Sequence, residues 1–82
     1  MEIKEELEEE TQKWLEKIKK ERENIILSDS SREDFLENID AYISDSEFFL
    51  EHEELIEAFE AVIWGWAMLE LGQELGILEK NI

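Results

Sequence analysis

The sequence predicts an all-α fold, a three-helix up-down-up bundle that we expect to associate into a dimer. Proline is absent and glycine occurs three times among 82 residues, while Glu, Lys, Leu and Ile dominate, a composition typical of helices. Apolar residues recur at helical spacing in three segments, at about 2–27, 32–51 and 54–75. We therefore expect residues 1–82 to form a single helical-bundle domain. Residues 1–12 would be a projecting or frayed helix start, and 77–82 a flexible tail.

The first segment, 2–27, carries one apolar stripe made of Ile3, Leu7, Trp14, Ile18 and Ile25. Acidic residues fill its N-terminal half and basic residues follow at 13–22, an order that suits the helix dipole. A basic cluster can bind phosphate, but Glu16, Glu21 and Glu23 are interleaved with it. This mixture favours a solvated, ion-paired helix face.

The second segment follows a break at 28–34, where Ser30 and Ser31 are each followed three positions later by an acidic residue. This spacing predicts a serine N-cap, and the helix then runs to about residue 51. The next break, 51–54, contains neither Gly nor Pro, so its position depends on the phase of the apolar residues alone. A tight turn here predicts an antiparallel hairpin with the third segment.

The third segment carries two apolar stripes on nearly opposite sides of one helix. Trp64 and Trp66 are two positions apart, which is about 200° of helical rotation. One stripe contains Leu55, Phe59, Val62, Trp66 and Leu69, and the other contains Ala61, Trp64, Met68, Leu71 and Leu75. Gly76 is a natural left-handed stop for this helix.

A small bundle needs one broad apolar face on each helix, so the second stripe predicts an interface. The predicted interface residues are Trp64, Met68, Leu71 and Leu75, with Leu78 at the edge. The predicted core residues are Trp14, Ile18, Phe35, Ile39, Tyr42, Ile43, Leu50, Leu55, Phe59, Val62, Trp66 and Leu69. The alternative is that the first helix or the C-terminal tail covers the second stripe within one chain.

The net charge of −16, from 24 acidic and 8 basic residues, argues against direct nucleic-acid binding and against anionic membrane surfaces. The longest uncharged run, 61–69, is too short to cross a bilayer, and the charged N-terminal sequence lacks a secretory signal, so we expect a cytoplasmic protein. Cysteine is absent and His52 is the single histidine, which excludes thiolate and His-rich metal sites. We predict no catalytic, cofactor-binding or metal-binding residues, and no enzyme.

With the helices placed, residues 40–78, DAYISDSEFFLEHEELIEAFEAVIWGWAMLELGQELGIL, resemble a small archaeal family, domain of unknown function 357. The matching features are Tyr42, the acidic turn 51–54, Ala58 with Ala61, and the Leu71–Gly72 pair, and the resemblance extends over about 12–78. The family hairpin usually has a glycine at its turn, where this chain has His52 and Glu53. The resemblance implies an archaeal source and a compact helical bundle, but no known activity.

The preferred functional hypothesis is a non-enzymatic protein–protein interaction module that self-associates through the third helix. Its further partner would be an unknown protein, for which the acidic surface suggests a basic face. One alternative is a divalent-metal or small-ligand-binding protein that uses the carboxylates around the turn 51–54. Another is an acidic partner or mimic for a basic nucleic-acid-binding protein.

Overall fold

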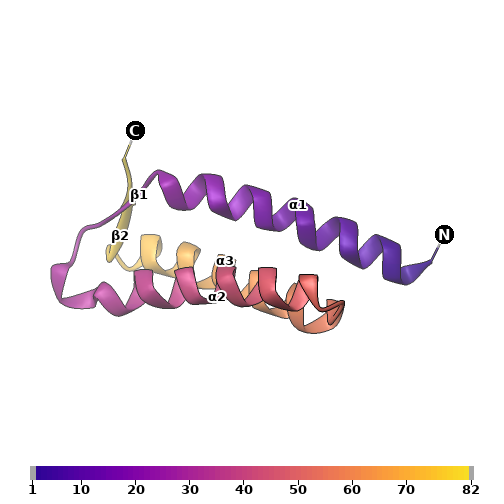
Figure 1. Cartoon of the computed structure of the whole chain (residues 1–82). Helices are drawn as coiled ribbons and strands as arrows, with labels where there is room; N and C mark the ends of the chain where they lie inside the picture. Colours follow the sequence, from indigo (N-terminus) through magenta and orange to yellow (C-terminus); the bar gives the residue numbers. More distant parts are fainter. Residues whose placement is uncertain (1, 82) are drawn as a thin grey trace.

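The computed structural model describes residues 2–81, and within them three α-helices confirm the predicted all-α class. They are α1 (Ile3–Glu23), α2 (Glu33–Glu51) and α3 (Leu55–Glu74). A short 3-10 helix, η1 (Ser30–Arg32), precedes α2. Figure 1 shows α2 and α3 as an antiparallel hairpin, with α1 lying along it and its N-terminal end extending past the α2–α3 turn. Residues 1 and 82, the outermost residues of the two predicted terminal segments, lie outside the described residues.

The first helix is shorter than predicted, because residues 25–27 form strand β1 (Ile25–Leu27) instead of a final helical turn. Isoleucine is β-branched and suits a strand better than a helix end. A partner strand, β2 (Leu78–Lys80), pairs antiparallel with β1, and Ile26 lies opposite Glu79. The helical spacing of Ile18 and Ile25 therefore reflects burial in the same core, not one continuous helix.

The C-terminal segment also differs from the expectation of a flexible tail, because Leu78–Lys80 form β2. Gly76 adopts the predicted left-handed conformation, with φ of 74°. The Ile77 N–H donates to the Gly72 carbonyl at 2.9 Å, and the Gly76 N–H donates to the Gln73 carbonyl at 3.2 Å. This pair of bonds is a Schellman motif, which turns the chain so that Ile77 and Leu78 become buried.

The start of α2 is organised by Asp29, so the predicted serine N-cap was wrong. The Asp29 carboxylate accepts hydrogen bonds from Ser31, from its hydroxyl at 2.6 Å and its backbone N–H at 3.0 Å. These two donors hold the pKa of Asp29 below its usual value. Arg32, at the N-cap position of α2, donates instead to the Asp34 carboxylate at 3.0 Å through both Nε and Nη2.

Small residues bring α3 close to its neighbours. A Cβ atom at Gly65 would lie 3.0 Å from Ile18 Cδ1 of α1 and 3.4 Å from Tyr42 Cβ of α2. Close to the turn, the buried Ser46 hydroxyl of α2 donates to the Ala58 carbonyl of α3 at 2.7 Å. The contact between α2 and α3 is therefore tight along the hairpin.

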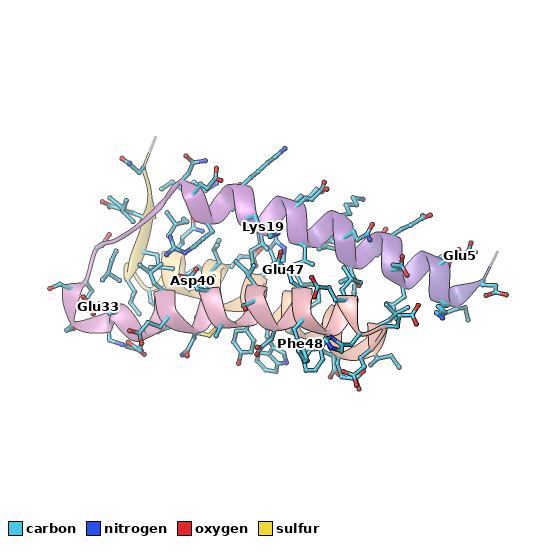
Figure 2. The ribbon with its side chains drawn as sticks, in the orientation of Figure 1. Glu5, Lys19, Glu33, Asp40, Glu47 and Phe48 are labelled. Carbon is cyan, nitrogen blue, oxygen red and sulfur yellow. The ribbon has the colours of Figure 1, made fainter. Side chains whose placement is uncertain are left out.

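Ion pairs connect the basic half of α1 to carboxylates of α2. Arg22 donates to both carboxylate oxygens of Asp40, at 2.7 and 3.1 Å. Lys19 pairs with Glu47, and Figure 2 shows these two side chains pointing toward each other between the helices. The cluster at 13–22 thus contributes ion pairs within the fold, each worth at most about 1 kcal/mol because it is exposed.

Candidate interaction surface on α3

The outer face of α3 carries most of the predicted interface residues in exposed positions. Trp64 is 58 % exposed, Leu71 47 % and Leu75 61 %. Met68, on the same face, is partly buried against the core. In the part of the chain that the structure describes, neither α1 nor β2 covers this face. The alternative that the first helix or the C-terminal tail covers the second stripe therefore does not apply to these exposed residues. We call Trp64, Met68, Leu71 and Leu75 the α3 strip.

Leu78, expected at the edge of the interface, lies in the core instead. It is 2 % exposed, and its Cδ1 atom would be 2.6 Å from a Cβ atom at Gly72. The sequence signal that was missed is Gly76, since a left-handed stop reverses the chain and returns the next apolar residues to the bundle. This signal was used to end the helix but not to place Leu78 in the core.

The two neighbouring tryptophans of α3 face different surroundings. Trp66 is half-buried and its ring packs edge-on against Trp14 of α1, with centroids 5.8 Å apart and planes at 84°. Its Nε1 also donates to the Trp14 carbonyl at 3.2 Å. Trp64 has no such aromatic neighbour within the described residues and stays mostly exposed. The pair thus splits into one ring in contact with α1 and one ring on the surface.

The remaining predicted core residues are found at two levels of burial. The buried ones are Ile18, Phe35, Ile39, Ile43, Leu55, Val62 and Leu69. Those with intermediate exposure are Trp14, Tyr42, Leu50, Phe59 and Trp66. The partly exposed side chains lie at the margins of the bundle, where each helix meets solvent.

The polar groups near the α2–α3 turn do not assemble a metal site. Within residues 2–81, no three His, Asp or Glu side chains come together in an arrangement that could hold a metal ion. His52 stacks on Phe48, with ring centroids 4.2 Å apart, and its Nδ1 lies 2.8 Å from the Phe48 carbonyl oxygen. Figure 2 shows Phe48 on the side of α2 that points away from α1.

None of the helices in residues 2–81 combines the length and the apolar content that a membrane crossing requires.

Comparison with protein families identifies the fold described above. The family model for a protein of unknown function, DUF357, matches residues 7–78. The chain belongs to this family. The DUF357 match includes all three helices apart from the first turn of α1, together with β1 and the first residue of β2.

Among solved structures, the chain is similar to the crystal structure of protein AF1782 from Archaeoglobus fulgidus, also described by the DUF357 family model. The two sequences are 48 % identical, and the TM-score is 0.89. The match covers 96 % of this chain and 99 % of that chain. A search of the curated proteins found no match. The family has an archaeal member and a shared helical fold, and its function is unknown.

Proposed function

We propose that this DUF357 protein is a non-enzymatic interaction module that self-associates through the α3 strip. The observation that carries the proposal is the exposure of Trp64, Leu71 and Leu75 on one face of a helix whose opposite face is buried in the core. Large aromatic and aliphatic side chains of this kind are typical of interface centres.

The spacing of the α3 strip favours a second helix as its occupant. Trp64, Met68, Leu71 and Leu75 follow one another at intervals of four, three and four residues, which is the pattern of a coiled-coil seam. A two-fold dimer buries the same strip from both copies, so each seam meets an identical seam. No charged residue lies within the strip, so contact between two copies brings no carboxylates together at its centre.

The energetics favour a weak dimer. Full burial of a large apolar side chain contributes about 1.5–3 kcal/mol, and the strip side chains have roughly half of that contribution left to gain. Four of them from each of two copies contribute on the order of 6–12 kcal/mol. Association costs about 4–15 kcal/mol in lost motion. Near the lower end of that cost, a net gain of about 6 kcal/mol remains, which corresponds to a dissociation constant of tens of micromolar. We therefore expect association at tens of micromolar and above.

The proposal is tested by sedimentation velocity over a concentration series, with wild type and Trp64→Glu compared. A charge at Trp64 would have to be desolvated in the dimer, so the variant should be a monomer at concentrations where wild type is a dimer. Leu75→Glu, at a position 61 % exposed, should act in the same way.

Phe48→Glu is the matched control, because Phe48 is 53 % exposed but lies on α2, outside the strip. It should leave the dimer unchanged, and circular dichroism should show all three variants to be folded. A wild-type protein that stays monomeric at tens of micromolar would refute self-association.

A further inference from the structure

A second apolar surface lies at the other end of the hairpin, between the start of α1 and the start of α3. A groove of about 420 Å³ is lined there by Ile3 and Leu7 of α1 and by Leu55 and Ile56 of α3. A further hollow of about 230 Å³ shares Ile3 and Leu7 and includes Phe59. Ile3 is 82 % exposed and Ile56 66 %, so these two residues of the lining are open to solvent, whereas Leu55 is buried. We call these two hollows together the α1–α3 groove.

The rim of the α1–α3 groove is strongly acidic. Five glutamates line it, together with a single basic residue, Lys4; the glutamates are Glu6, Glu10, Glu53, Glu54 and Glu57. The ion pairs of α1 lie toward its other end, on Lys19 and Arg22. Carboxylates around an open apolar groove therefore carry a local negative charge that the described ion pairs do not balance.

We propose that the α1–α3 groove binds a basic amphipathic helix from a partner protein. Apolar side chains on one face of that helix would pack on Ile3, Leu7, Ile56 and Phe59, and its lysines or arginines would pair with the glutamates of the rim. This is the helix-in-groove mode of recognition, with specificity added by charge. It is a second binding surface, separate from the α3 strip, and does not depend on self-association.

A second copy of this chain fits the groove poorly. Of its basic residues, Lys19, Arg22, Arg32 and Lys80 already form ion pairs within residues 2–81. The groove of one copy would meet a strongly acidic surface on the other, and like charges in contact oppose binding. Charge complementarity thus selects a cationic partner.

The test uses a synthetic probe, an amphipathic Leu/Lys peptide of about 18 residues with leucines at helical spacing. Titration of the full-length protein is followed by isothermal calorimetry and by backbone amide NMR. We expect shifts at Ile3, Leu7, Ile56 and Phe59, and a dissociation constant that rises with salt because screening weakens the charge pairs. The same peptide with glutamates in place of its lysines should not bind.

Two charge-matched triple variants locate the site. Glu53→Gln, Glu54→Gln and Glu57→Gln together remove three charges from the rim, and Glu33→Gln, Glu37→Gln and Glu79→Gln remove three exposed charges elsewhere. The rim triple should weaken peptide binding about tenfold, and the distant triple less than twofold. Ile3→Asp should also weaken binding without lowering the melting temperature, since Ile3 contributes little to the core.

Several results would overturn the proposal. Equal weakening by the two triples would mean that the peptide responds to total charge alone. NMR shifts confined to Trp64, Leu71 and Leu75 would place the peptide on the α3 strip, a result that Trp64→Glu would check by abolishing binding. If neither calorimetric heat nor NMR shifts were seen at low salt, the groove would not bind a basic amphipathic helix and the proposal would be wrong.

Discussion

The two ends of the α2–α3 hairpin differ in whether their apolar side chains are covered by the rest of the chain. At one end, β1 and β2 form an antiparallel pair, and Ile77 and Leu78 are 6 % and 2 % exposed. At the other end, the α2–α3 turn and the first turns of α1 leave Ile3 and Ile56 open to solvent. Figure 1 shows the difference, with the strand pair closing one end and α1 extending past the other.

This difference separates residues that hold the fold from residues that are free to bind. At the closed end, Ile77 and Leu78 are buried and contribute to stability, whereas Ile3 and Ile56 at the open end gain burial only when a partner covers them. Charges follow the same division, because Arg22 and Lys19 are paired near the closed half of α1 while the rim of the α1–α3 groove is acidic. Substitutions at the open end should therefore test binding without unfolding the protein.

The largest predicted effect is at Leu78 of β2. Leu78→Ala removes a side chain that is 2 % exposed, and such a change typically costs about 2–5 kcal/mol because it leaves a cavity. Urea denaturation followed by circular dichroism should show a correspondingly lower midpoint. For a domain of this size, a cost at the upper end of that range is comparable with the whole free energy of unfolding, so part of the Leu78→Ala protein would be unfolded at room temperature.

Ile3→Ala is the matched change at the open end, and we expect it to alter the free energy of unfolding by less than about 0.5 kcal/mol. Leu78→Val is a milder form of the closed-end change that keeps the protein folded for the comparison. If Ile3→Ala proved as costly as Leu78→Ala, the open end would be part of the core and the division between the two ends would be wrong.

The next effect concerns Gly72, where α3 meets the closed end. A Cβ atom there would lie 2.6 Å from Leu78 Cδ1 and 2.8 Å from Leu78 Cγ, so the branch point of the buried Leu78 side chain would have to move and not its end alone. Overpacking costs about 1–3 kcal/mol, while replacing glycine by alanine in a helix returns roughly 1 kcal/mol. Gly72→Ala should therefore lower the free energy of unfolding by about 1 kcal/mol in urea denaturation.

Gly65→Ala provides the comparison within the same helix. Its Cβ atom would meet Ile18 Cδ1 at 3.0 Å, the far end of a side chain that can shift by a few tenths of an ångström. The free energy gained from the higher helix propensity of alanine should then roughly offset the cost of this close contact, so the free energy of unfolding should stay within about 0.5 kcal/mol of wild type. A larger loss at Gly65 than at Gly72 would contradict the tight packing of the strand pair on α3.

The same contrast explains which features could be predicted from sequence. The three helices and the core stripe followed from apolar spacing, because each stripe is local and is buried by its neighbours. The strands β1 and β2 could not be predicted in this way, since Ile25 and Leu78 are far apart in sequence and each strand is three residues long. The exposure of Trp64, Leu71 and Leu75 agrees with the surplus apolar stripe, and their role in a dimer stays a prediction.

The α1–α3 groove also could not be predicted from the sequence. Ile3 and Leu7 were placed on the stripe of the first helix, yet only the structure places them beside Ile56 at the start of α3. The acidic residues of the two segments were visible separately, but their common position at one rim depends on how α1 lies along the hairpin. A surface formed by two distant segments has no periodic signature in either one.

After Leu78 and Gly72, the third predicted change in stability is at the α2–α3 turn of the open end, and it is a gain where the first two are losses. Helix α2 ends with the same Schellman bonds as α3: the Glu53 N–H donates to the Leu50 carbonyl at 3.2 Å, and the Glu54 N–H donates to the Phe49 carbonyl at 2.9 Å. The left-handed residue here is Glu53, with φ of 57°, where α3 has Gly76. A non-glycine residue in this conformation costs about 1–2 kcal/mol.

Glu53→Gly should therefore stabilise the protein. The relief of the left-handed strain is partly offset because glycine has greater freedom in the unfolded chain, so we expect a net gain of about 0.5–1 kcal/mol and a melting temperature a few degrees higher. Gly76→Ala is the reverse change, because it puts a non-glycine residue into a left-handed conformation. A Cβ atom at Gly76 would meet nothing within 4 Å, so the backbone strain acts alone and should destabilise the protein by a similar amount. If Glu53→Gly lowered the melting temperature instead, the Glu53 side chain would have to make a stabilising interaction that outweighs its backbone strain, and the open end would contribute to the fold as well as to binding.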